Sequence, residues 1–110
     1  MGAMKKGLYA AIRYSQQRLA VGESGESDTP IMSYQLQQNA ILPLLARTIV
    51  LNLGMNKAKF LFASPGDRKH EIIKTLCAVK AIVTWHCEKV GRVCRERTGG
   101  AGFLEYNMLA

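Results

Sequence analysis

The first helical pattern covers about residues 5–21. Apolar and small side chains recur there at a spacing of three or four residues, on a stripe formed by Leu8, Ile12, Ser15 and Leu19. This spacing is typical of one face of an α-helix. The stretch that follows, "GESGESDTP" at residues 22–30, is rich in glycine, serine and acidic residues. Such a composition predicts an exposed loop after the first helix.

A second pattern covers residues 31–63. Its i, i+4, i+7 spacing predicts an amphipathic helix, with a stripe formed by Leu36, Ala40, Leu44, Thr48, Leu51, Met55, Ala58 and Phe62. Pro43 lies inside this segment. Because proline lacks a backbone N–H, we expect a bend there unless the helix begins at that point. The triplet "SPG" at residues 64–66 predicts that the helix ends at Ala63.

A third pattern covers residues 67–98, with Asp67 as the expected N-cap. Its stripe consists of Ile72, Leu76, Val79, Val83, Val90, Val93 and Arg97. The three-residue connection between the second and third segments forces them to run antiparallel. The sequence therefore predicts an all-α fold, an antiparallel up-and-down helical bundle made of a long helical hairpin and a shorter first helix.

The second and third segments carry apolar residues on more than one face, which indicates that a single short helix does not cover them. The missing cover has to come from another subunit or from other parts of a larger protein. We therefore expect the chain to be a homo-oligomer, with a dimer as the simplest case.

The chain has 110 residues, enough for one small domain, and its hydrophobic and charged fractions of 48 % and 21 % are those of a globular protein. Residues 1–4, "MGAM", look like a remnant of cloning, so we assign the domain to residues 5–110. No apolar run is long enough to span a bilayer. The first residues also lack the apolar region of a signal peptide.

The formal net charge of +7 raises the question of an anionic partner. Nucleic acid is disfavoured as the partner, because no zinc finger, RNA-recognition signature or set of stacking aromatics accompanies the cations.

The three cysteines, Cys77, Cys87 and Cys94, form no C-x-x-C motif. We interpret them as reduced, small buried hydrophobic residues and predict no metal site. Trp85 is interpreted as a packing residue.

A glycine turn at residues 99–102 follows the basic end of the third helix. Gly99 suits the left-handed position that ends many helices. Gly100 and Gly102 go beyond that need, and they suggest that another group approaches the backbone closely. A nucleotide-binding G-x-G-x-x-G motif requires a strand before it and a helix after it, so that reading fails here.

Three stretches together resemble the C-terminal helical domain of acyl-CoA oxidases, in the acyl-CoA dehydrogenase superfamily. "AAIRYSQQRLAVG" at residues 10–22 is similar to the family's RY-x-x-x-R-x-x-x-G helix end. "YQLQQNAILPLLA" at residues 34–46 is similar to its YQ-x-QQ helix. "LCAVKAIVTWHCEKVGRVCRERTGGAGF" at residues 76–103 is similar to its TW helix and its CR-x-x-x-GG-x-G turn. Their order and spacing carry the resemblance.

The resemblance implies a helical bundle that supports FAD at a subunit interface. In the family the flavin takes a hydride from a fatty acyl-CoA and then reacts with oxygen, giving trans-2-enoyl-CoA and hydrogen peroxide in fatty-acid beta-oxidation. Residue by residue, the resemblance implies that Arg18 approaches the FAD pyrophosphate and that Gln38 contacts the adenosine part of FAD. It also implies that Gly99 and Gly100 form the turn that meets the cofactor. It places the protein in the peroxisome in a eukaryote, and otherwise in the cytoplasm.

Each implied role has a simpler alternative. Arg18 at a helix C-terminus also suits the helix dipole without any ligand, and Gln38 fits a solvent-facing helix position. We assign no catalytic residue, because the family's glutamate base lies after the turn and Glu105 is too close to it. The chain looks like a fragment or a truncated relative of an oxidase, inactive by itself. The alternative function is a non-catalytic helical module for dimerisation or protein interaction.

Overall fold

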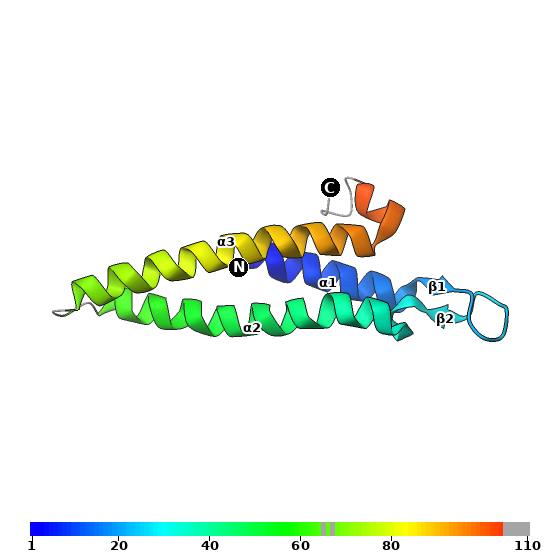
Figure 1. Cartoon of the computed structure of the whole chain (residues 1–110), viewed down its shortest axis with the longest axis horizontal. Coiled ribbons are helices and arrows are strands. Elements are labelled where there is room, and N and C mark those ends of the chain that lie inside the picture. The colour runs from blue at the N-terminus through cyan, green and yellow to red at the C-terminus, as the bar shows by residue number, and fades with distance from the viewer. Residues whose placement is uncertain (65, 67, 105–110) are drawn as a thin grey trace.

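The computed structural model of the chain describes residues 1–64, 66 and 68–104. Within them, the main elements are the helices α1 (Gly2–Gln17), α2 (Gln35–Ala63) and α3 (Lys69–Arg97). Figure 1 shows α2 and α3 as a long hairpin with α1 lying along one part of it. The predicted all-α hairpin with a shorter first helix is therefore confirmed. The molecule is elongated, with a long axis of 65 Å.

Short elements replace the ends of two predicted helices. The first helix ends at Gln17 and is followed by a two-stranded ribbon, in which β1 (Leu19–Ala20) pairs antiparallel with β2 (Thr29–Pro30). A 3-10 turn, η1 (Ile31–Ser33), then precedes α2. The ribbon forms because backbone groups find partners across it: the N–H of Ile31 donates to the carbonyl of Arg18 over 2.9 Å. The loop predicted at residues 22–30 thus includes a strand.

The hydroxyl of Tyr34 adds a second link across this end of the molecule, donating to the Val21 carbonyl over 2.8 Å. Gly22 is required here, because a Cβ on it would collide with the side chain of Thr29. Backbone hydrogen bonds, an aromatic side chain and a close approach therefore fix where α1 ends and α2 begins. A helical pattern that continues to residue 21 cannot reveal any of these contacts.

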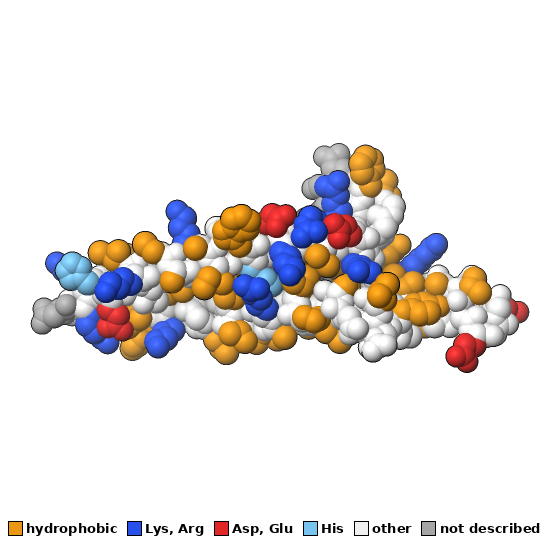
Figure 2. Space-filling view, viewed as in Figure 1, with side chains coloured by type: hydrophobic (Ala, Val, Ile, Leu, Met, Phe, Trp, Pro, Cys, Tyr) orange, Lys and Arg blue, Asp and Glu red, His pale blue; other side chains and the backbone are white. Residues whose placement is uncertain are grey.

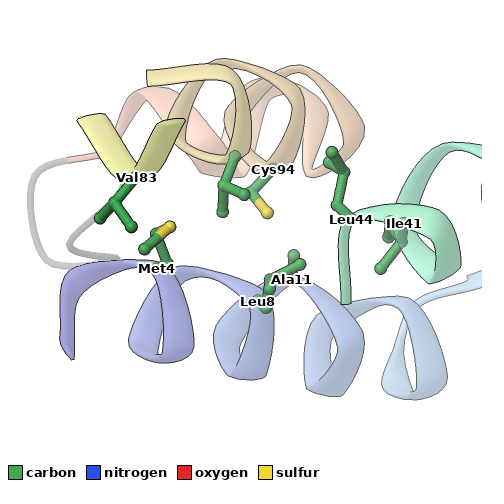
Figure 3. Packing of buried hydrophobic residues seen from close by; sticks show 8 residues of the cluster. Met4, Leu8, Ala11, Ile41, Leu44, Val83 and Cys94 are labelled. Carbon is green, nitrogen blue, oxygen red and sulfur yellow. The ribbon is translucent and has the colours of Figure 1, made fainter. Parts of the chain in front are cut away.

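The first residues of the chain belong to the fold. Gly2 to Met4 are helical, and the Met4 side chain is 1 % exposed. Figure 3 shows Met4 pointing toward Val83 of α3. Although residues 1–4 look like a cloning remnant, the side chain of Met4 completes the contact between α1 and α3. Their cloning origin stays a prediction.

The core lies where the three helices meet (Figure 3). Its buried cluster consists of Met4, Leu8, Ala11, Ile41, Leu44, Val83, Val90 and Cys94. On α2 the buried stripe is shifted from the predicted one at both ends, since Gln37 and Leu61 are buried while Leu36 and Phe62 are 72 % and 68 % exposed. The shift arises because α2 is apolar on several sides, so that periodicity alone fits two neighbouring stripes. Helix α2 also runs through Pro43 and does not begin there.

Helix α3 ends as predicted, but parts of its surface differ from expectation. Trp85 is 76 % exposed, so it does not pack inside this chain. Of the cysteines, Cys94 is buried, Cys87 packs against the core and Cys77 is exposed. Burial raises the pKa of the Cys94 thiol to about 11, which keeps it protonated and unreactive. The predicted N-cap, Asp67, lies outside the described residues.

Candidate functional site

A buried polar cluster ties the three helices together near the glycine turn. The amide nitrogen of Gln37 on α2 donates to the hydroxyl of Ser15 on α1 over 2.9 Å, and to the Arg97 carbonyl at the end of α3 over 3.1 Å. The Ser15 hydroxyl in turn donates to the Ala11 carbonyl over 2.7 Å. Both amide hydrogens of Gln37 are thus used, which is the favourable state for a buried polar group.

This cluster brings the four predicted site residues to one end of the bundle. Arg18 lies three residues after Ser15, Gln38 follows Gln37, and Gly99 lies two residues after Arg97. Figure 1 shows the C-terminal ends of α1 and α3 and the N-terminal end of α2 at the same end of the molecule. The sequence could not single out Gln37 over Gln38, because both lie in the same "QLQQ" stretch.

The three glycines of the turn serve different purposes. Gly99 follows α3 with a φ of 59°, so the predicted left-handed glycine is confirmed. The turn continues as a 3-10 helix, η2 (Gly99–Phe103). A Cβ on Gly102 would lie 2.5 Å from the Arg95 carbonyl oxygen, so this glycine allows η2 to pack on the end of α3. Gly100 has no positive φ, and nothing in the described structure lies within 4 Å of the Cβ position.

Arg18 and Gln38 differ in their burial and in the hydrogen bonds that they make within the chain. Arg18 is exposed at the C-cap of α1, and its guanidinium has neither an ion pair nor a side-chain hydrogen bond within the described part of the chain. Gln38 is half-buried, and its amide nitrogen donates to the Met32 carbonyl over 3.0 Å, which supports η1. Gln38 therefore has a structural role at the start of α2, whatever else it contacts.

An open cleft of about 620 Å³, here called the turn cleft, lies between the end of α3 and η2. It is lined by Glu88, Gly91, Arg92, Arg95, Glu96, Gly99 and Phe103. Arg92 is held between Glu88 and Glu96 at 3.5 and 3.4 Å, whereas Phe103 is 76 % exposed. Space-filling atoms in Figure 2 show this mixture of cations, anions and apolar groups beside the projecting turn.

A second polar contact joins α2 and α3 in the middle of the hairpin. The Nε2 atom of His86 lies 2.9 Å from the hydroxyl of Thr48, and that hydroxyl donates to the Leu44 carbonyl over 2.8 Å. Because the single Thr48 proton is used, Nε2 must carry a proton and donate. Burial lowers the pKa of His86, and the nearby cations Arg47 and Lys89 lower it further, against a backbone hydrogen bond with Leu44 that raises it. No pattern in the sequence indicates that His86 and Thr48 meet.

The polar contacts described above hold the helices together. Burial and the nearby cations favour the neutral form of the His86 ring in the unliganded chain. Among the described residues, no group of three or more histidine, cysteine or acidic side chains is placed to hold a metal ion. Within the part of the chain that the structure describes, none of the helices combines the length and the hydropathy of a membrane span. Near the glycine turn, Arg18, Arg95 and Gly100 are exposed.

Comparisons with known proteins give a consistent result. The sequence profile of the family described as "Acyl-CoA oxidase, C-alpha1 domain" matches residues 1–110. The chain is 31 % identical over 105 residues to "Putative acyl-coenzyme A oxidase 3.2, peroxisomal" from Arabidopsis thaliana, covering 94 % of this chain and 16 % of that protein. It is 30 % identical over 120 residues to "Peroxisomal acyl-coenzyme A oxidase 3" from Homo sapiens, covering 96 % and 17 %.

A further relative, "Acyl-coenzyme A oxidase 3, peroxisomal" from Arabidopsis thaliana, is 31 % identical over 107 residues, which cover 96 % of this chain and 16 % of that protein. The chain thus spans about a sixth of the length of these relatives. No solved structure matches it significantly.

Proposed function

The chain belongs to the acyl-CoA oxidase family as its C-alpha1 domain, and on that premise we propose that it supplies contacts to FAD in a complete oxidase. The complete protein would convert fatty acyl-CoA to trans-2-enoyl-CoA with formation of hydrogen peroxide. FAD, when bound, supplies the hydride acceptor of that reaction. This domain contributes binding and orientation, and we assign it no catalytic residue.

The single observation that carries the proposal is the unexplained glycine at position 100. Gly99 and Gly102 are required by the chain itself, one by its φ and the other by its packing on Arg95. Gly100 is exposed and has open space around its Cβ position, so neither reason applies to it. A glycine with no internal purpose leaves a bare backbone, which is what a closely approaching ligand requires.

The residues at this end of the bundle have the chemistry needed to contact FAD. The exposed guanidinium of Arg18 would hold the pyrophosphate, since arginine matches phosphate oxygens with two parallel hydrogen bonds. Gly99 and Gly100 would offer backbone to the cofactor. Gln38 would contact the adenosine part through its carbonyl oxygen or its second amide hydrogen, because only one hydrogen of its amide nitrogen donates to Met32.

The test is FAD dissociation from a full-length oxidase that contains this domain. We expect Arg18→Ala to weaken FAD binding by roughly tenfold to a hundredfold, because a charge-assisted contact to phosphate is worth about 1.5–3 kcal/mol. Gly100→Val should weaken it by shape, with little dependence on salt. Gln38→Ala should cost about fivefold, the equivalent of one neutral hydrogen bond of about 1 kcal/mol.

Arg13→Ala is the matched control, because Arg13 is an exposed arginine of the same helix. Helicity, measured by circular dichroism, shows whether each variant is folded. If Arg18→Ala and Gly100→Val both retain FAD as the parent does, the turn is only a helix stop and the cofactor proposal fails.

We also propose that the domain associates with apolar surface outside this chain, in a homodimer or within a larger protein. The support is the exposure of large apolar side chains, with Phe60 and Phe62 at 69 % and 68 % and Trp85 at 76 %. Monomeric proteins rarely expose apolar surface of this extent unless it serves an interaction.

Since the relatives named above are called peroxisomal, we propose the peroxisome as the location of the complete protein.

A further inference from the structure

A smaller cleft lies on α2 and α3 beside the turn cleft, with which it shares Glu88 and Arg92. This His86 cleft has a volume of about 240 Å³ and is lined by Arg47, Trp85, His86, Glu88, Lys89 and Arg92. Figure 2 shows several blue cations and a pale blue histidine gathered over the middle of α2 and α3. Three cations from two helices therefore converge beside an exposed aromatic ring.

The three cations of the cleft differ in whether they have an ion-pair partner. Arg92 is paired with Glu88 and Glu96. Arg47 and Lys89 have no ion-pair partner among the described residues, and both lie close enough to His86 to act on its charge. On the remaining helix, Lys5 of α1 lines a separate groove beside Thr48. The excess positive charge is thus concentrated between Arg47 and Lys89.

His86 adds a polar atom that the chain leaves unsatisfied. Its Nε2 edge is directed to Thr48 of α2, whereas its Nδ1 is buried and has no hydrogen-bond partner within the described structure. Buried polar atoms of this kind are rare and call for an explanation. With Nε2 committed as a donor, Nδ1 becomes a second donor once the ring takes up a proton. Because His86 lines the cleft, we place the acceptor for this atom there.

We infer that the His86 cleft binds a single phosphate group, held between Arg47 and Lys89 and hydrogen-bonded by His86 in its doubly protonated form. Two unpaired cations match the two negative charges of a phosphate group. The volume argues for one such group rather than a whole nucleotide, since pockets that enclose larger ligands measure about 300–1,000 Å³. This site is independent of the proposed FAD contact.

The experiment follows the ring protons of His86 by NMR in the intact chain, with inorganic phosphate as the probe at constant ionic strength. Only two histidines are present, so exposed His70 at the other end of α3 is an internal control. Phosphate should raise the measured pKa of His86 by about half a unit or more and leave that of His70 unchanged. A response shared by both histidines, or none at His86, overturns the inference.

Variants locate the site. Arg47→Gln and Lys89→Gln should each weaken phosphate binding by roughly threefold to tenfold, as expected for loss of one charge-assisted contact. Lys80→Gln, at an exposed position of α3 that does not line the cleft, should leave it unchanged. Acetate serves as the carboxylate arm of the titration. If acetate raises the pKa of His86 as much as phosphate does, the site takes carboxylates and the assignment to phosphate is wrong.

Discussion

The two ends of the α2–α3 hairpin differ in what covers them. At the end near the glycine turn, α1 lies along the hairpin, and residues such as Leu8 and Ile41 are fully buried. Beyond Val83 toward the hairpin connection, only α2 and α3 face each other, and Ala58, Leu61 and Ile72 are the buried apolar residues of that part. The two helices are equally long, so the difference comes from the third helix.

Where only α2 and α3 pack together, each helix buries a single stripe of side chains. Where α1 joins them, enough side chains are buried that polar groups such as Gln37 can form hydrogen bonds inside the bundle. The covered end holds Gln37 with its partners satisfied, and Phe60, in the uncovered end, is exposed in spite of its size. Apolar surface drives association in proportion to the area removed from water. We therefore expect the uncovered end to be the part of the domain that gains stability from the proposed association.

The largest expected effect is a difference in the free energy of unfolding between two matched side-chain truncations, one at each end of the hairpin. Ile41→Ala, in the covered end, should lower the free energy of unfolding by about 2–5 kcal/mol, because it removes buried surface and leaves a cavity. Phe60→Ala should change the free energy of unfolding of the monomer by less than about 0.5 kcal/mol. Urea denaturation at a concentration where light scattering reports a monomer is the appropriate measurement, since association would add to stability.

The same two variants test association. Phe60→Ala should shift the light-scattering mass toward the monomer at higher concentration, and Ile41→Ala should not do so while it remains folded. A parent chain that stays monomeric at micromolar concentration would contradict the proposal that the uncovered end associates.

The next effect concerns the polar cluster of the covered end. Gln37→Leu should lower the free energy of unfolding by about 1–3 kcal/mol, because the Arg97 carbonyl loses its side-chain donor and Ser15 loses a partner inside the core. Gln38→Leu is the matched control and should cost about 1 kcal/mol or less, since its contact with Met32 is half-exposed. Equal losses for the two variants, again by urea denaturation, would show that the cluster has no special role.

The smallest effect is a pH dependence from His86. Its pKa is lowered in the folded chain by burial and by Arg47 and Lys89, so the unfolded chain takes up the proton at higher pH. The stabilisation is fully present above the ordinary histidine pKa of about 6.5 and is lost as the pH falls toward the lowered folded value.

We expect the urea midpoint to fall between pH 7.5 and pH 5 in phosphate-free buffer. His86→Gln should remove this dependence and His70→Gln should keep it. The carboxyl of Asp28 does not interfere, because hydrogen bonds from Ser24 and Thr29 lower its pKa from 3.8, outside this range. A midpoint that falls equally in His86→Gln would assign the effect to other groups.

The sequence by itself determined the features that depend on neighbouring residues along the chain. Apolar spacing predicted three helices, "SPG" predicted the end of α2 at Ala63, and Gly99 predicted the left-handed end of α3. It also carried the family, since the motifs around Arg18, Gln38 and the turn retain their order. Local preferences of this kind act over a few residues, so a sequence pattern can display them.

The tertiary structure alone decided which faces are buried and which polar groups meet. It placed Gln37, and not Gln38, in the buried polar cluster with Ser15. It also paired His86 with Thr48 and placed Met4 in the core. It also ended α1 early, through the hydrogen bond between Ile31 and Arg18. These outcomes depend on contacts between residues far apart in the chain. On a helix as apolar as α2, the position of its neighbours and not its own periodicity chooses the buried stripe.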